Sequence, residues 1–238
     1  AGIVATGSAL APYLEFPPLT RAVAQPPFSP AVFCALAVIA VAAVAPLALV
    51  GLRNRSTLCP EMPARPLPAW IWAGLALTGG GWLLAWSRLE WFADLQRHTF
   101  LPLWLGYIVV VNALHRRAAG WCLLTDHPRY LAALAGVSTV FWWYFEFANR
   151  VTGNWYYRGV ETFGAGEYAL FASLSFATVL PAVISTYLWL LAIPRLAGPY
   201  AGLRPLRVRR PRALGADVRL LAVLGLAMLP LRPDLAYP

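Results

Sequence analysis

The carboxylate best placed for chemistry in this sequence is Glu146, which lies in a run of apolar and aromatic residues. The run reads Phe141-Trp142-Trp143-Tyr144-Phe145-Glu146-Phe147-Ala148-Asn149-Arg150. A carboxylate in such surroundings is costly unless it is paired, hydrogen-bonded or protonated. Arg150 lies one helical turn further on and would form a structural pair with Glu146. Alternatively, desolvation would favour the protonated carboxyl and would suit Glu146 to donating a proton.

A second group of polar residues, Glu90, Asp94 and His98, follows a four-residue spacing. If residues 88–98 form an α-helix, these three side chains share one stripe of its surface. An apolar stripe lies beside it and consists of Trp91, Phe92 and Leu95. One interpretation is an amphipathic helix that lies in a membrane interface. The other is a metal or acid–base site, which would need further ligands from another helix.

The two acidic stretches resemble each other. Trp86-x-x-x-Glu90-Trp91-Phe92-Ala93-Asp94 is similar to Trp142-x-x-x-Glu146-Phe147-Ala148-Asn149, which lies 56 residues later. This similarity predicts a parallel repeat of residues 67–114 and 131–193, with both carboxylates facing a shared outer cavity. Chance similarity in a tryptophan-rich chain is the alternative.

The elements that must position these residues are transmembrane helices. Of the 238 residues, 60% are hydrophobic and only 12% are charged, whereas soluble domains average roughly 25% charged residues. The apolar residues also form long uninterrupted runs, as in helices that lipid surrounds. We therefore predict an all-α transmembrane helical bundle over residues 31–238, preceded by an extracytoplasmic or interfacial segment over residues 1–30.

We predict five spans whose lengths are near the ~20 residues that are needed to cross a bilayer, and a shorter sixth. The predicted spans cover about 31–52, 67–86, 100–114, 131–149, 168–193 and 220–231. The second contains Gly79-Gly80-Gly81, which would let a neighbouring helix approach closely. The sixth run has twelve apolar residues, which span only ~18 Å as a helix, so we expect the native chain to continue beyond Pro238.

The arginines predict the orientation. All 19 basic residues are arginine, and 13 of them fall in the loops after the first, third and fifth spans. The positive-inside rule then places these loops in the cytoplasm and the N-terminus outside. This distribution predicts a multi-pass protein of a bacterial inner membrane. The basic stretch with Arg204, Arg207, Arg209, Arg210 and Arg212 is either a topology signal alone or also a site for anionic lipids.

Composition excludes several classes of function. The arginines lie in short loops between apolar runs, so nucleic acid binding is not expected. The absence of lysine excludes chemistry that needs a lysine Schiff base, including that of a retinal pigment. The three cysteines have no CxxC spacing and predict no zinc site. His98 and His115 would lie ~25 Å apart at opposite ends of the third span, so one chain cannot ligate a haem with both. No cofactor is identified.

One local resemblance to a known family exists. Glu146-Phe147-Ala148-Asn149, followed by Trp155-Tyr156-Tyr157 and by the segment 164–171 with Glu167, resembles the membrane-embedded lycopene cyclase domain. The resemblance implies a helical membrane protein and proton-initiated cyclisation of a polyene end group. This chain lacks the proline and paired glutamates of the family's acidic motif. As a whole, the chain resembles bacterial polytopic membrane proteins of this general layout.

Three functions are consistent with the sequence, and we favour the first. The chain would be a non-catalytic accessory or structural subunit that packs against other membrane proteins. Alternatively, it would be an enzyme acting on an apolar lipid or isoprenoid, with Glu146 as proton donor and Glu90 or Glu167 as its partner. The aromatic residues that would contact lipid or stabilise a substrate cation are Trp142, Trp143, Trp155, Tyr156 and Tyr157. A transporter ranks last, because few polar residues are expected at mid-membrane depth.

Overall fold

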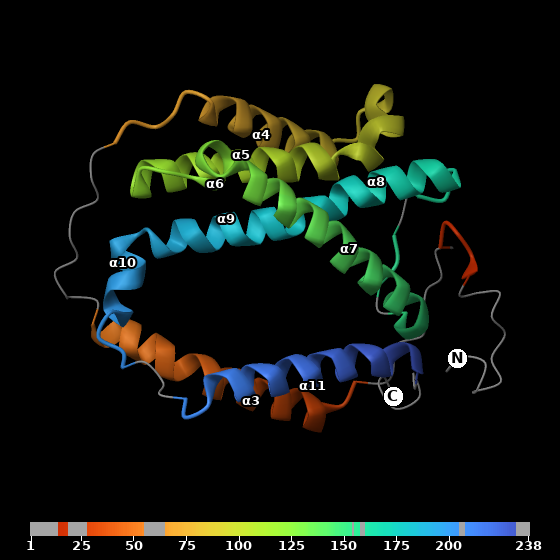
Figure 1. Cartoon of the computed structure of the whole chain (residues 1–238). Coiled ribbons are helices and arrows are strands. Elements are labelled where there is room, and N and C mark those ends of the chain that lie inside the picture. The colour runs from red at the N-terminus through yellow and green to blue at the C-terminus, as the bar shows by residue number, and fades with distance from the viewer. Residues whose placement is uncertain are drawn as a thin grey trace. The chain divides into compact units, whose positions relative to one another are not determined.

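The computed structural model describes residues 14–18, 28–54, 65–153, 155–157, 160–204 and 208–231, and these form only helices and connecting segments. In chain order the elements are α3 (Pro30–Arg53), α4 (Ile71–Trp86), the 3₁₀ helix η1 (Glu90–His98), α5 (Phe100–Ala119), α6 (Leu123–Asp126), α7 (Pro128–Thr152), α8 (Ala165–Ala177), α9 (Val179–Leu191), α10 (Pro194–Ala197), η2 (Gly198–Tyr200) and α11 (Pro211–Leu231) (Figure 1). The predicted all-α fold is therefore confirmed for the described residues.

Three stretches in the described residues are long and apolar enough to cross a membrane, namely α3, α7 and the 27 residues from Ala165 to Leu191 that α8 and α9 form together. A fourth is added if η1 and α5, bent by 64° at their junction, count as one broken span. α4 is apolar but has only 16 residues, which reach ~24 Å of the ~30 Å hydrocarbon core. The coarse prediction of a membrane protein with several apolar helices thus agrees with the structure.

Two of the helical stretches differ in detail from the predicted spans. The predicted span 168–193 is interrupted at Thr178, between α8 and α9. Pro181 lacks an N–H group, and its ring crowds the carbonyl four residues earlier, which disfavours a regular helix at this point. The predicted span 220–231 is the second half of α11, which begins at Pro211. Arginine and leucine are both good helix formers, so the helix extends beyond the apolar run.

The chain divides into two compact units. Unit 1 contains residues 1–23, 136–177 and 205–238, and unit 2 contains residues 24–135 and 178–204. The units do not follow the predicted repeat, because the second predicted half, 131–193, is divided between them. The two similar stretches also differ in local structure, since one spans the end of α4 and part of η1 whereas the other lies wholly within α7. The repeat stays a prediction from sequence.

In unit 2, α4 packs closely against α5, as Figure 1 shows. The predicted Gly79-Gly80-Gly81 patch contributes only Gly81, where an added Cβ would lie 3.3 Å from the backbone nitrogen of Leu103. An added Cβ at Gly79 or Gly80 would meet nothing within 4 Å. The tightest contact is instead at Gly106, where a Cβ would lie 2.6 Å from the Thr78 nitrogen. The two helices can approach this closely because this residue has no side chain.

Polar side chains join α5 to α9 in the same unit. The Asn112 amide donates to Ser185 Oγ at 3.0 Å and to the Ile108 carbonyl at 2.9 Å, and both side chains are buried. Tyr107 Oη and Thr186 Oγ1 lie 2.7 Å apart. Because Thr186 donates its own hydrogen to the Ala182 carbonyl, the tyrosine is the donor of this bond. Buried polar groups that are fully paired hold neighbouring helices in one register.

In unit 1, α7 packs on α8 through aromatic rings and hydroxyl groups. Ser138 Oγ donates to the Phe176 carbonyl, and Trp143 Nε1 donates to Ser173 Oγ at 3.0 Å. The rings of Trp142 and Phe176 are stacked with centroids 6.3 Å apart. Tyr144 Oη also donates to the Leu226 carbonyl, which connects α7 to α11. These contacts set the environment of Glu146, which α7 carries.

Candidate functional site

Glu146 is the centre of the strongest candidate site. Its side chain lies on α7 and only 2% of its surface is exposed. Tyr157 Oη donates to Oε2 and Tyr168 Oη donates to Oε1, each at 3.0 Å. Tyr157 lies in the connection after α7, and Tyr168 lies in the first turn of α8. A buried carboxylate therefore has one hydroxyl donor on each of its two oxygens, as burial of a charge requires.

Asn149, one turn after Glu146, holds the connecting segment in place. Its amide nitrogen donates to the Trp155 carbonyl at 2.7 Å, and its Oδ1 accepts from the Trp155 backbone N–H at 3.0 Å. Gly153 follows the end of α7 and has a φ of +62°. This left-handed backbone conformation suits glycine. Trp155 Nε1 then donates to Tyr157 Oη at 3.1 Å. Asn149 thus positions the backbone of Trp155, and the Trp155 side chain in turn positions the Tyr157 hydroxyl beside the carboxylate.

The electrostatics of this segment favour a protonated tyrosine. Burial, followed by the neighbouring Glu146 carboxylate and its hydrogen bond, raises the pKa of the Tyr157 hydroxyl above its ordinary value. A phenol whose pKa is raised keeps its proton at neutral pH and acts as a donor. The chain of donors therefore runs from Trp155 through Tyr157 to Glu146.

Aromatic rings surround the tyrosine on α8. The ring of Phe16 lies edge-on to Tyr168 with centroids 5.4 Å apart, and it lies 6.1 Å from the ring of Trp143. The guanidinium carbon of Arg150 lies 5.7 Å from the centroid of Phe16. Residues 14–18 therefore bring an aromatic ring from the N-terminal part of the chain onto the Glu146 cluster. This contact could not be read from the spacing of residues along α7.

Most of the residues predicted to act with Glu146 are not the ones that contact its carboxylate. Tyrosines, and not Arg150, supply the hydrogen bonds that the structure gives to the Glu146 oxygens. Glu167 is exposed on α8, whereas the next residue, Tyr168, contacts the carboxylate. Glu90 is exposed on η1 and belongs to unit 2. Of the predicted aromatic contacts, Tyr157 touches Glu146, and Tyr156 is exposed.

Asn149→Ala is expected to loosen the connection after α7 without unfolding the protein. The variant removes two hydrogen bonds to Trp155, each worth about 0.5–1.5 kcal/mol. Hydrogen exchange measured by mass spectrometry in detergent should therefore speed up in peptides covering residues 153–160. Exchange in α5 serves as the internal control and should be unchanged. Equal exchange of the connecting segment in the variant and the parent protein would contradict the role given to Asn149.

The second predicted group, Glu90, Asp94 and His98, lies on a 3₁₀ helix and not on an α-helix. At three residues per turn, residues four apart point about 120° away from each other, so the expected shared stripe does not form. No group of three or more histidine, cysteine or acidic side chains in the described parts of the chain is arranged to hold a metal ion. The helix geometry on which the metal hypothesis depended is therefore corrected.

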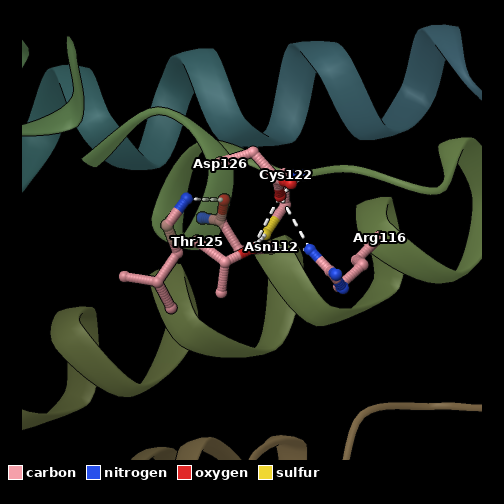
Figure 2. Close-up of polar contacts among 6 residues, drawn as sticks. Asn112, Arg116, Cys122, Thr125 and Asp126 are labelled. Carbon is pink, nitrogen blue, oxygen red and sulfur yellow. Dashed lines mark hydrogen bonds and ion pairs between the residues drawn. The ribbon is translucent and has the colours of Figure 1, made fainter. Parts of the chain in front are cut away.

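A second polar cluster lies at the turn between α5 and α6 (Figure 2). Arg116 forms an ion pair with Asp126 at 2.7 Å and also donates to Thr125 Oγ1 at 2.7 Å. Asp126 Oδ2 accepts from Thr125 Oγ1 and from the Cys122 backbone N–H. Because the threonine hydrogen is used in this way, the Cys122 thiol is the donor in its 3.1 Å contact with Thr125. Asn112 Oδ1 completes the cluster by accepting from the Leu124 backbone N–H.

Asp126→Asn is expected to lower stability at neutral pH and to remove an acid-sensitive step. Hydrogen bonds from Thr125 and Cys122, with a further contribution from Arg116, hold the pKa of the Asp126 carboxyl below its ordinary value of 3.8. The stabilisation is therefore present above pH 3.8 and is lost as the pH falls towards the lower native pKa. Thermal melts in detergent should show parent and variant converging below pH 3.8. A difference that stays constant down to pH 3 would contradict this assignment.

Sequence reasoning overlooked most of this second cluster. Asn112 lies in the predicted third span and is the one amide in the run from residue 100 to 114. An uncharged polar residue in such a run signals a hydrogen-bonded helix contact. Asp126 lies shortly after the end of α5, and its contacts with Arg116, Cys122 and Thr125 depend on the geometry of the turn there. The signal for Tyr168 was weaker, since tyrosine is common near membrane interfaces.

Comparison with known proteins leaves the site to be interpreted from its own geometry. Glu146, Asn149, Trp155 and Tyr157, which carry the resemblance to the lycopene cyclase domain, lie in one hydrogen-bonded cluster, but that resemblance stays a prediction from sequence. The chain matches no protein-family model, no curated protein and no solved structure.

Proposed function

We propose that this chain is a non-catalytic accessory or structural subunit of a larger membrane assembly. The observation that carries the proposal is the state of Glu146, the strongest candidate for catalysis. It is 2% exposed, and both of its oxygens accept hydrogen bonds from tyrosines of its own chain. A carboxylate engaged in this way joins α7 to α8 and to the connection between them, and only 2% of its surface is open to a substrate.

The helix surfaces support a role in assembly. None of the residues of α3 is buried within the chain, although this helix has 24 residues. The two other candidate spans also bury only about a fifth of their most apolar stretch, 17% for α7 and 22% for Ala165–Leu191. These apolar surfaces need lipid or other membrane proteins as neighbours. Small residues on α3, such as Ala40 and Ala45, would let a partner helix pack closely.

The proposed topology has five spans and a weaker sixth in a bacterial inner membrane, with the N-terminus outside and the basic loops in the cytoplasm. The support is the arginine distribution together with the apolar helices α3, α4, α5, α7 and α8–α9. In the basic stretch, Arg204, Arg209, Arg210 and Arg212 are exposed, while Arg207 lies outside the described residues. We include contact with anionic lipid headgroups in the proposal for this stretch.

The test is to purify the protein from its native membranes in a mild detergent and to measure the particle mass. The subunit proposal expects a particle far larger than one 26.0 kDa chain, with other membrane proteins in fixed stoichiometry. A particle of one or two copies that carries a polyisoprenoid lipid would contradict it and would favour an enzyme.

The alternative is an enzyme that cyclises an apolar isoprenoid, and one observation favours it. The buried Glu146 lies beside Tyr168, whose ring is in contact with Trp143 and Phe16, so a carbocation could be stabilised nearby. Glu146 would protonate a terminal double bond of a polyene. The cation would close a ring and lose a proton, which returns to the carboxylate, so that no redox partner is needed.

Glu146→Gln tests this alternative in reconstituted membranes with an acyclic carotenoid as substrate. An enzyme should convert the substrate in the parent protein and lose turnover in the variant, while insertion and particle size stay the same. Asp217→Asn, which changes an exposed carboxylate on α11 that has no role in this hypothesis, is the control and should retain activity under the same conditions. No conversion by the parent protein would contradict the cyclase alternative for this substrate class.

A further inference from the structure

The connection between α4 and α5 carries an exposed apolar surface outside the Glu146 site. The connection contains η1, in which the side chains of Trp91 and Leu95 are 72% and 53% exposed. Leu89, directly before η1, is 44% exposed. Charged residues alternate with them, since Glu90, Asp94 and Arg97 are exposed as well. An element with one apolar and one charged side needs two different environments.

The 3₁₀ geometry decides which residues share the apolar side. The first bond of this pitch runs from the Phe92 backbone N–H to the Leu89 carbonyl, at 3.0 Å. With three residues per turn, side chains three apart are eclipsed, so Phe92 and Leu95 share one row, while Trp91 shares another row with Asp94 and Arg97. An α-helical reading of the sequence groups Trp91 with Phe92 and Leu95 instead. The structure thus separates Trp91 from the apolar row of Phe92 and Leu95, and Leu89 precedes this row as the extended residue at the start of η1.

Gln96 holds η1 against the end of α4. Its side-chain amide has two hydrogens and donates to the carbonyls of Ser87 at 2.6 Å and Ala85 at 3.0 Å. These carbonyls lie at the C-terminus of α4, where a helix leaves its last carbonyl groups without backbone partners. These hydrogen bonds therefore fix η1 beside the C-terminal end of the apolar helix α4. It is also bent by 64° from α5, far from the direction of a membrane-crossing helix.

From these observations we propose that η1 lies in the headgroup region of the membrane, with the row of Phe92 and Leu95 inserted towards the acyl chains. The occupant of the apolar row is the phospholipid interface. Burial in the hydrocarbon core is disfavoured because Glu90, Asp94 and Arg97 would enter it too. Full exposure to water is disfavoured by the apolar row. Trp91, whose side chain is 72% exposed in the row of Asp94 and Arg97, matches the preference of tryptophan for the interface between lipid and water.

The proposal extends beyond the proposed function, because it holds for a subunit and for an enzyme alike. It requires only that α4 be embedded in a membrane. Leu77, in the middle of α4 and 41% exposed, provides a reference position for that requirement. A wrong placement of η1 and a failure of α4 to insert into the membrane can therefore be distinguished in one experiment.

The experiment places one nitroxide label at a time on the full-length protein in phosphatidylcholine–phosphatidylglycerol nanodiscs. The three native cysteines are first replaced by serine. Labels are then attached through Leu95→Cys on the apolar row, Asp94→Cys on the charged side and Leu77→Cys as the depth reference. Electron paramagnetic resonance measures the accessibility of each label to oxygen, which concentrates in lipid, and to a water-soluble nickel chelate.

The expected oxygen-to-nickel ratio at position 95 is higher than at position 94 and lower than at position 77. Equal ratios at 94 and 95, both dominated by nickel, would overturn the proposal because η1 would then lie in water. Protection of position 95 from both reagents would overturn it in favour of a protein partner. Ratios at 94 and 95 as high as at 77 would show an inserted segment. Nickel access at position 77 itself would contradict membrane insertion of α4.

Discussion

Gly106→Ala is expected to lower the free energy of unfolding by about 3 kcal/mol, although alanine is the better helix former. An added Cβ would lie 2.4 Å from Thr78 Oγ1, 2.6 Å from the Thr78 nitrogen and 2.8 Å from the Gly74 carbonyl oxygen. Two of these atoms belong to the backbone of α4, so the clash cannot be relieved by turning a side chain. The helices α4 and α5 must move apart, which loosens their whole interface.

Gly79→Ala is the matched control for this prediction. Gly79 also lies within an apolar helix of unit 2, but an added Cβ there meets nothing within 4 Å. This variant should be equal to the parent protein or more stable by up to about 1 kcal/mol. Equilibrium unfolding in mixed detergent micelles measures both variants. If the Gly106→Ala variant were as stable as the Gly79→Ala variant, the close packing of α4 against α5 at Gly106 would be contradicted.

The contrast between Gly79 and Gly106 also shows what the sequence can predict. Long apolar runs predicted helices close to α3, α5 and α7, because lipid-facing helices are apolar on all sides and need no partner to be recognised. The triple glycine predicted a close helix contact, but only Gly81 takes part in it. Which face of a uniformly apolar helix meets its neighbour depends on packing, and apolar patterning carries little information about that.

The form of η1 illustrates a second limit of sequence reasoning. The four-residue spacing of Glu90, Asp94 and His98 is meaningful only if the segment is α-helical. The structure has a 3₁₀ helix here, and Gln96 binds the end of α4. A tertiary contact of this kind overrides the local preference and regroups every side chain on the segment.

The partners of Glu146 show the same limit at the candidate site. The sequence correctly identified a costly carboxylate that needs compensation, because charge in an apolar run is conspicuous. The partner expected from helix spacing was Arg150, four residues away. The tyrosines that donate to the carboxylate come from 11 and 22 residues further along the chain. Contacts across such separations depend on how α7, the connection and α8 fold together.

Glu146→Ala is expected to lower the free energy of unfolding by about 2–5 kcal/mol, since it removes the acceptor of two tyrosine hydroxyls and leaves a cavity in a buried site. Tyr157 and Tyr168 both donate to this carboxylate. Glu146→Gln should cost less, because its amide keeps the volume and one acceptor oxygen. The exposed Glu167→Ala is the control and should change stability by less than about 0.5 kcal/mol. Unfolding in mixed micelles provides the measurement for all three variants.

A double-mutant cycle separates the network from simple packing. Tyr168→Phe keeps the ring that contacts Phe16 and Trp143 but removes the hydroxyl. In a structural network, the losses from Tyr168→Phe and Glu146→Ala should be less than additive, because either change breaks the same bond. If both losses are small and independent, Glu146 does not hold the helices together. A buried carboxylate without a structural role is then best explained as a proton-transfer group, and the enzyme becomes the better proposal.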